Sequence, residues 1–162
     1  MATFISHSPA ETAALGEAWG RAAAQGLVIG LCGDLGAGKT QLVKGLARGL
    51  GVVECVRSPT FVLVNVYTGG RLPLFHLDLY RLETREQIIA AGLEEYLKPA
   101  GVAVIEWAER WLGEVRAPQT AKHGLRADKS SASGSFSGRL RWVRLDVISD
   151  TERRISYEDS GT

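Results

Sequence analysis

The sequence predicts an α/β fold in which helices flank a mixed, mainly parallel sheet that carries an antiparallel hairpin insertion. Two short apolar runs, 27–32 and 102–105, have the pattern of strands that are covered on both faces. Amphipathic helical patterns lie before and after the first run, at 9–24 and 42–50. A glycine-rich loop separates the first run from the second helical pattern, which gives the strand–loop–helix order of α/β proteins.

The first helix has a complete start signal. Ser8 is suited to the N-cap, Pro9 to the first helical position, and Glu11 completes a capping box. Apolar residues then recur at helical spacing and predict the face that contacts the core: Leu15, Ala18, Trp19 and Ala22. Gly51 stands where the second helix would end in a left-handed cap.

Two antiparallel strand pairs are predicted further along the chain. Residues 61–67 and 72–77 flank Thr68-Gly69-Gly70-Arg71, and a Gly-Gly pair tolerates the positive φ angles of a tight hairpin turn. Residues 140–147 alternate as a strand, with 153–157 as the expected partner.

A third helix is predicted between the hairpin and the second buried strand. Thr84 and Gln87 are suited to cap it, and the helical pattern runs to about residue 97. Pro99 and Gly101 then stop the helix.

Size and composition predict a single domain over residues 1–162. The 162 residues are 45% hydrophobic and 23% charged, which is typical of globular chains, and a formal net charge of +1 gives no general affinity for polyanions. Cys32 and Cys55 are spaced for neither a zinc site nor a disulfide framework. Because no signal-peptide pattern or membrane-length apolar stretch occurs, we expect a cytoplasmic protein without membrane contact.

A serine- and glycine-rich segment departs from this composition, and we expect a flexible loop at about 117–138. Around it, residues 110–144 hold eight basic side chains against Glu114 and Asp128. Two interpretations fit this local charge: a solvated basic loop, or a contact surface for RNA or an acidic protein.

The glycine-rich loop carries the clearest chemical signal. Residues 33–40, Gly-Asp-Leu-Gly-Ala-Gly-Lys-Thr, match the phosphate-binding pattern G-x-x-x-x-G-K-S/T between a strand and a helix. In such a loop backbone N–H groups surround a phosphate, Lys39 neutralises the outer phosphates, and the Thr40 hydroxyl is offered to Mg²⁺. The residues expected to bind nucleotide here are Gly33, Gly36, Ala37, Gly38, Lys39, Thr40 and the following Gln41.

Nucleotide hydrolysis also needs a carboxylate near the metal and a group that orients water. Glu106 ends the buried run 102–105, where the carboxyl end of a parallel strand would carry it toward the phosphate loop. Asp78 ends the second hairpin strand and is suited to polarise water or to hold the magnesium shell. The sequence leaves the division of these two roles open.

Three further residues each have a structural and a functional interpretation. His76 is either a strand histidine or a catalytic base, and Thr60 either opens the hairpin or contacts a terminal phosphate. Trp107 either packs in the core or lies against a nucleotide or a partner.

Four motifs occur in a fixed order along the chain: Gly-Asp-Leu-Gly-Ala-Gly-Lys-Thr at 33–40, Ser-Pro-Thr-Phe at 58–61, His-Leu-Asp-Leu-Tyr-Arg-Leu at 76–82 and Ile-Glu-Trp at 105–107. This combination resembles the bacterial TsaE (YjeE) family, small ATPases of tRNA threonylcarbamoyladenosine synthesis. The resemblance implies a P-loop NTPase fold with a mixed sheet, ATP and Mg²⁺ as cofactors, and Mg²⁺ held by Thr40 and Glu106.

The resemblance also implies roles and partners. Asp78 matches the family's catalytic-site aspartate, so the implied catalytic set is Asp78, Lys39 and Glu106. Residues 9–12, with Thr12 as a nucleotide contact, and 150–153 would approach the adenine. The implied partners are the TsaD and TsaB subunits that transfer threonylcarbamoyl to tRNA, so this chain would contact tRNA indirectly or weakly.

Two other functions stay open. A small P-loop kinase for a metabolite or nucleoside would use Arg126, Arg139 and Arg141 as a mobile lid over the phosphates. A non-catalytic module would bind ATP and present the hairpin as a nucleotide-dependent contact surface. The sequence does not favour a GTP switch, because the chain has neither an Asn-Lys-x-Asp nor an Asp-x-x-Gly motif.

Overall fold

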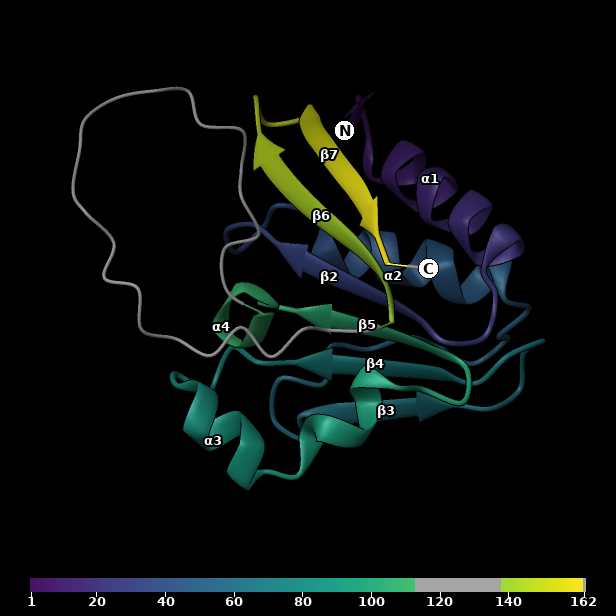
Figure 1. The fold of residues 1–162 in the computed structure, drawn as a ribbon. Helices are drawn as coiled ribbons and strands as arrows, with labels where there is room; N and C mark the ends of the chain where they lie inside the picture. The colour runs from purple at the N-terminus through teal and green to yellow at the C-terminus, as the bar shows by residue number, and fades with distance from the viewer. Residues whose placement is uncertain (113–137, 162) are drawn as a thin grey trace.

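A seven-stranded sheet forms the centre of the molecule, in a computed structural model that describes residues 1–112 and 138–161. The strand order is β1-β7-β6-β2-β5-β4-β3 (Figure 1). The strands are β1 (Ala2–Ser6), β2 (Leu27–Cys32), β3 (Val64–Tyr67), β4 (Leu74–Asp78), β5 (Val102–Glu106), β6 (Arg139–Val147) and β7 (Arg153–Ser160). The helices are α1 (Pro9–Ala22), α2 (Lys39–Gly49), α3 (Arg85–Ala90), the 3-10 helix η1 (Leu93–Leu97) and α4 (Glu109–Leu112).

The centre of the sheet is parallel and its edges are antiparallel. β2 pairs in parallel with both β5 and β6, and β4 pairs in parallel with β5. β3 is added antiparallel at one edge, and β7 and β1 at the other. The predicted mixed sheet with a hairpin is therefore confirmed. Because β2, β4 and β5 are parallel, their carboxyl ends lie at the same end of the sheet.

Helices cover both faces of this sheet (Figure 1). In β2, the side chains of Ile29 and Leu31 pack with α1 and α2, whereas Val28 packs with α3 and α4 on the other face. The same alternation occurs in β5, where Val104 and Ile105 belong to opposite cores. Because successive strand residues point to opposite faces, both faces need apolar side chains, which explains the unbroken apolar runs.

Helices α1 and α2 approach each other closely because glycines line their contact. On α1, Trp19 is buried as predicted, but Ala18 and Ala22 are exposed, and the rest of the buried face includes Gly16 and Gly20. On α2, a Cβ at Gly45 would stand 1.9 Å from a backbone oxygen of α1. The helix that follows the phosphate loop is thus held against α1 by backbone contact.

Gly45→Ala is expected to destabilise the protein by about 1–3 kcal/mol, the usual cost of overpacking. In a solvent-exposed helix the same change is stabilising by about 1 kcal/mol, because Ala is the better helix former. Urea unfolding measures the difference, with Lys44→Ala at the exposed neighbouring position as control. A stability of Gly45→Ala equal to or above that of the wild type would contradict the close contact.

The segment predicted as one helix over 84–97 is two shorter helices. Thr84 and Gln87 form the expected capping box at the start of α3. Gly92 then takes a left-handed conformation with φ of 76°, which ends α3 and begins η1. The predicted helix is therefore correct at its start and wrong in its continuity.

The glycines of the hairpin turn are there for a different reason from the one predicted. Neither Gly69 nor Gly70 has a positive φ. A Cβ at Gly70 would instead stand 2.5 Å from the carbonyl oxygen of Leu50, so a close approach to the end of α2 requires this glycine. The prediction of a strand pair was right, and the reason given for its glycines was wrong.

Two predictions fall on residues 113–137, which lie outside the described part of the chain. They are the flexible loop at about 117–138 and most of the basic segment, so the single domain over 1–162 stays a prediction. Within residues 1–112 and 138–161, no helix is long and apolar enough to cross a membrane.

Candidate nucleotide-binding site

The phosphate loop connects β2 to α2 at the end of the sheet where the carboxyl ends of the parallel strands lie. Gly36 and Gly38 have φ angles of 80° and 98°, and Gly38 is the N-cap of α2. A Cβ at Gly33 would stand 2.6 Å from the carbonyl oxygen of Leu145 in β6. Residues with side chains are strained at all three positions, so the loop conformation requires the glycines of the motif.

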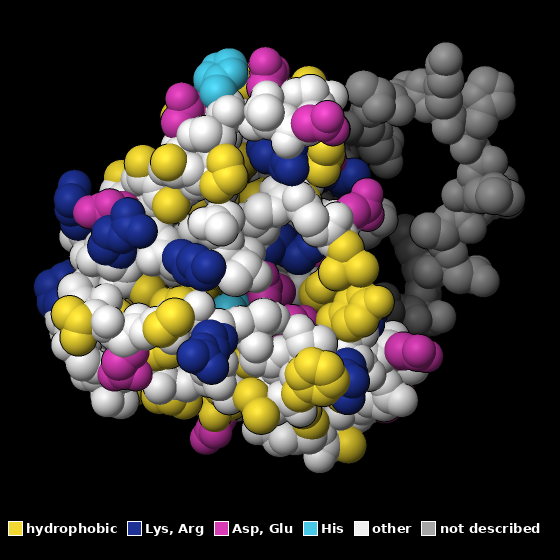
Figure 2. Space-filling view, turned by 180° about the vertical axis from the view of Figure 1, so that it is seen from behind, with side chains coloured by type: hydrophobic (Ala, Val, Ile, Leu, Met, Phe, Trp, Pro, Cys, Tyr) yellow, Lys and Arg dark blue, Asp and Glu magenta, His cyan; other side chains and the backbone are white. Residues whose placement is uncertain are grey.

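Lys39 is buried at the start of α2, with 7% of its surface exposed. Its Nζ donates hydrogen bonds to the carbonyls of Gly33 and Asp34 within its own loop. Burial lowers the pKa of Lys39, and the carboxylates of Glu106 and Glu109 act in the opposite direction. Figure 2 shows acidic and histidine side-chain atoms in a recess between Lys and Arg side chains.

Trp107 follows β5 directly and has a strained backbone, with φ of 60°. This conformation is uncommon for a residue other than glycine, and it often marks a functional position. The ammonium of Lys39 lies 4.4 Å from the centre of the Trp107 ring, and the ring of Tyr80 lies 5.3 Å from it. Trp107 thus borders the phosphate loop through a cation–π contact.

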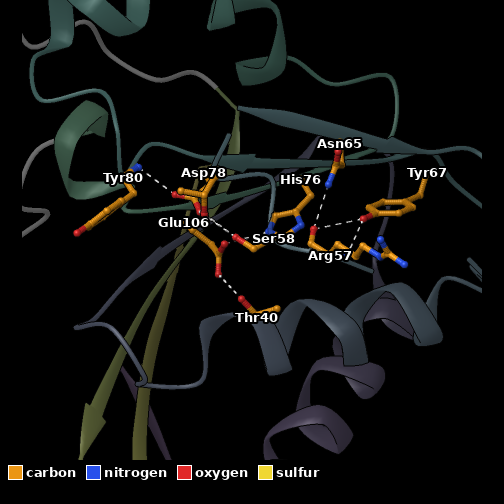
Figure 3. Close-up of polar contacts among 10 residues, drawn as sticks. Thr40, Arg57, Ser58, Asn65, Tyr67, His76, Asp78, Tyr80 and Glu106 are labelled. Atoms are coloured by element: carbon orange, nitrogen blue, oxygen red, sulfur yellow. Dashed lines mark hydrogen bonds and ion pairs between the residues drawn. The ribbon is translucent and has the colours of Figure 1, made fainter. Parts of the chain in front are cut away.

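Glu106 meets Thr40 beside this loop. The Thr40 hydroxyl donates to Oε1 of Glu106 over 3.2 Å, and His76 Nε2 lies 3.1 Å from the other carboxylate oxygen (Figure 3). Glu106 is the last residue of β5 and is 3% exposed. The structure therefore brings together the two residues expected to hold magnesium.

Asp78 lies beside Glu106, because these two residues are paired across the parallel strands β4 and β5. Its Oδ2 accepts hydrogen bonds from the hydroxyls of Ser58 at 3.1 Å and Thr60 at 2.7 Å. Its Oδ1 accepts from the backbone N–H of Tyr80 at 2.9 Å (Figure 3). Thr60, for which the sequence left a contact with a terminal phosphate or a turn before the hairpin open, here donates to Asp78, and the part played by Ser58 was not predicted.

The hairpin holds the segment that carries these two hydroxyls. The Asn65 side-chain amide donates to the Arg57 carbonyl over 3.0 Å, and the Arg57 N–H donates to the Tyr67 hydroxyl over 3.1 Å (Figure 3). Strand β3 thus positions residues 57–60 over the end of β4.

The other residues expected to bind nucleotide differ in what they present to the loop. Thr12 is buried, and its hydroxyl lies 2.7 Å from that of Ser6, while its methyl group borders Gly38. The side chain of Ala37 packs in the core, so a nucleotide in the loop could contact only the backbone of this residue. Gln41 is half-buried in the first turn of α2.

The turn between β6 and β7 and the start of β7 also lie near the phosphate loop. Arg153 donates from its guanidinium to the Gly36 carbonyl over 3.3 Å. Glu152 lies 3.7 Å from His7, which precedes α1. Both segments expected near the adenine, 9–12 and 150–153, therefore have a residue next to the loop, Thr12 beside Gly38 and Arg153 at Gly36.

Cys32 ends β2 immediately before the loop. Burial raises the pKa of its thiol to about 11, and Sγ donates to the Val143 carbonyl. The thiol is therefore protonated at neutral pH and is a packing group rather than a nucleophile.

The arginines that would form a lid over the phosphates of a kinase are not placed at the phosphate loop, as far as the described residues show. Arg139 begins β6 opposite Leu27, at the end of the sheet remote from the phosphate loop. Arg141 forms two hydrogen bonds of 2.6 Å with Asp159 and lies 4.8 Å from the ring centre of Trp19. Arg126, the third member, lies outside the described residues.

The donor set at Thr40 and Glu106 fits magnesium bound together with a nucleotide. Among the described residues, no group of three or more His, Cys, Asp or Glu side chains is placed to hold a metal alone. Mg²⁺ commonly takes one or two protein oxygens and completes its octahedron with phosphate oxygens and water. A hydroxyl and a carboxylate beside a phosphate loop match that requirement.

The fold and this arrangement define a class. A parallel β2–loop–α2 unit with the phosphate-binding motif, and an acid at the end of the neighbouring strand, belong to the P-loop NTPase fold.

The particular family follows from comparison with known proteins. The family model described as "Threonylcarbamoyl adenosine biosynthesis protein TsaE" matches residues 6–134, and the chain belongs to this family. A Nostoc sp. protein named tRNA threonylcarbamoyladenosine biosynthesis protein TsaE is 52% identical over 100 residues, which are 59% of this chain and 61% of that protein. A Treponema pallidum protein of the same name is 48% identical over 111 residues, 68% of this chain and 82% of that one.

A solved structure agrees with this assignment. It is titled as the crystal structure of YdiB from Bacillus subtilis, and it superposes with a TM-score of 0.67 at 31% identity. The superposition covers 99% of this chain and 86% of the other. The TsaE resemblance carried by the four motifs and the P-loop fold are both confirmed.

Proposed function

We propose that this chain is a Mg²⁺-dependent ATPase that acts with TsaD and TsaB in the threonylcarbamoylation of the adenosine beside the anticodon of tRNA. The observation that carries the proposal is the contact of Thr40 with Glu106 next to the phosphate loop. Membership of the TsaE family supports the pathway.

In this proposal each residue has a distinct task. The loop N–H groups and the Lys39 ammonium bind the β- and γ-phosphates, and Thr40 and Glu106 hold magnesium, which neutralises charge on those phosphates. Asp78 orients the attacking water or accepts its proton, since it lies beside Glu106 and its carboxylate is fixed by Ser58 and Thr60.

Exposed hydrophobic side chains on the segments that border the site support a role for partners. Leu35 in the loop is 69% exposed, Phe61 and Val62 beside Thr60 are 78% and 64% exposed, and Tyr80 is 41% exposed. Figure 2 shows hydrophobic side chains beside the recess. A partner that binds here would bury these side chains and face the nucleotide.

The rate of phosphate release from ATP is expected to be slow for this chain alone and faster with TsaD, TsaB and tRNA. A cation supplied by a partner accelerates comparable P-loop NTPases by about 10³–10⁵. Equal rates alone and in the complex would contradict the proposed partnership.

Phe61→Ser tests the surface that carries this stimulation. We expect this variant to lose most of the partner-dependent increase in the rate of ATP hydrolysis, whereas Val53→Ser, at a 92% exposed position, keeps it.

Reconstituted tRNA modification over several turnovers provides a second test, and we expect this modification to need the chain. Modification that proceeds at the same multiple-turnover rate without the chain would count against the proposal.

A further inference from the structure

His76 is a fully buried polar side chain beside Glu106, and the roles assigned above do not use it. Its exposed fraction is 0%, and its Nε2 lies 3.1 Å from Oε2 of Glu106, which is itself 3% exposed (Figure 3). A strand residue at this depth is usually apolar. The contact with Glu106 is therefore the feature that accounts for a polar side chain at this buried position.

The contact fixes which ring nitrogen carries a proton. An ionised carboxylate only accepts hydrogen bonds, so a hydrogen bond between these two groups needs the proton on Nε2. Within the described part of the chain, Nδ1 is buried and has no hydrogen-bond partner. The Nε2–H form of the ring satisfies the bond to Glu106, and it leaves only an unprotonated nitrogen without a partner.

The two oxygens of Glu106 are thereby divided between two groups. Oε2 accepts from His76 on β4, and Oε1 accepts from the Thr40 hydroxyl on α2. The side chain of a glutamate turns about three single bonds, whereas the His76 imidazole turns about two and is fully buried. His76 thus turns Oε1 toward Thr40.

We propose that His76 is a positioning residue that orients the Glu106 carboxylate for magnesium binding. The inference rests on the proposed function, because it concerns the same magnesium position. A group that hydrogen-bonds to a metal ligand typically affects metal affinity by about 10–100-fold. Removal of the Nε2 donor is expected to have an effect of that size.

Two variants separate positioning from simple packing. His76→Gln places a side-chain amide nitrogen at the same number of bonds from the backbone as Nε2, so it keeps a donor for Glu106. His76→Asn ends one bond earlier, near the position of Nδ1, and loses that donor. Both variants replace the ring with a smaller amide, so a purely structural role would affect them similarly.

The measurement is the affinity of a non-hydrolysable ATP analogue for the full chain, by isothermal titration calorimetry with Mg²⁺ and with EDTA. The gain in affinity that Mg²⁺ gives the wild type is expected to fall by about tenfold or more in His76→Asn, and to be retained in His76→Gln. Affinity in EDTA is expected to stay unchanged in both. Equal losses in the two variants, or no loss in either, would overturn the positioning role. Wild-type protein that binds no ATP analogue would overturn the proposed function itself, and this inference with it.

A second measurement needs no variant. In ¹⁵N-labelled wild-type protein, long-range ¹H–¹⁵N spectra report which imidazole nitrogen is protonated. The expected result is a protonated Nε2 for His76 with slow hydrogen exchange, since the ring is fully buried. An unprotonated Nε2 would overturn the inference even if His76→Asn failed to fold.

Discussion

Replacement of Lys39 by alanine is expected to weaken ATP binding by about 100-fold. Loss of one partner from a buried charged contact costs about 2–5 kcal/mol, and each 1.4 kcal/mol corresponds to about a tenfold change in Kd. Lys39 is placed for such a contact, because it is 7% exposed and starts the helix that follows the phosphate loop. Isothermal titration calorimetry with ATP measures the effect.

The matched control for this variant is Lys44→Ala. Lys44 lies on the same helix but is exposed, so its removal changes the net charge equally without touching the loop. Its Kd for ATP is expected to equal that of the wild type. If the two lysine variants bound ATP equally well, the assignment of Lys39 to the phosphates would be wrong.

The largest effects on turnover are expected from Glu106→Gln and Asp78→Asn. Each change keeps the size of the side chain and removes the negative charge, so kcat for ATP hydrolysis should fall by about 10²–10⁴ if the group handles metal or protons. The affinity for ATP measured without Mg²⁺ should change much less, because the loop and Lys39 supply most of the phosphate contacts. Single-turnover phosphate release together with ATP titrations separates the two effects.

Glu94→Gln is the control for loss of a carboxylate. Glu94 is exposed on η1, and it lies outside the group of side chains around the loop. Its kcat is expected to match that of the wild type. Undiminished hydrolysis in both Glu106→Gln and Asp78→Asn would remove these two acids from the mechanism.

The elements that local sequence determines could be predicted closely. The apolar run Leu27–Cys32 is β2 without any shift of its ends, and the run at 102–105 is β5 with Glu106 as its last residue. Both strands are covered on two faces, so an unbroken apolar pattern identifies them. The phosphate loop was recognisable for a similar reason, because its glycines are required by backbone geometry within a few residues.

Features that depend on distant backbone could not be predicted. The buried face of α1 includes glycines, which have no hydrophobic pattern, and only the approach of α2 reveals why they are there. Strand β1 was missed because it is a short edge strand whose residues are mostly exposed and which pairs with β7 near the far end of the chain.

The candidate site also contains residues that the sequence predicts and contacts that it does not. Thr40 and Glu106 stood out because each follows a recognisable element, and the parallel sheet brings their ends together. The contact of His76 with Glu106 joins residues 30 positions apart on two strands, and that of Ser58 with Asp78 joins a loop residue to a strand residue 20 positions away. Such contacts depend on strand register, which a single sequence does not fix at this precision.

The most direct test of the account is a crystal structure of the full chain with Mg²⁺ and a non-hydrolysable ATP analogue. The account predicts phosphates enclosed by residues 33–40, with the Lys39 ammonium on a phosphate oxygen. It also predicts Mg²⁺ at about 2.1 Å from the Thr40 hydroxyl, with Glu106 on the same ion directly or through water. A nucleotide bound elsewhere, or a metal on other residues with Thr40 and Glu106 still paired, would contradict it.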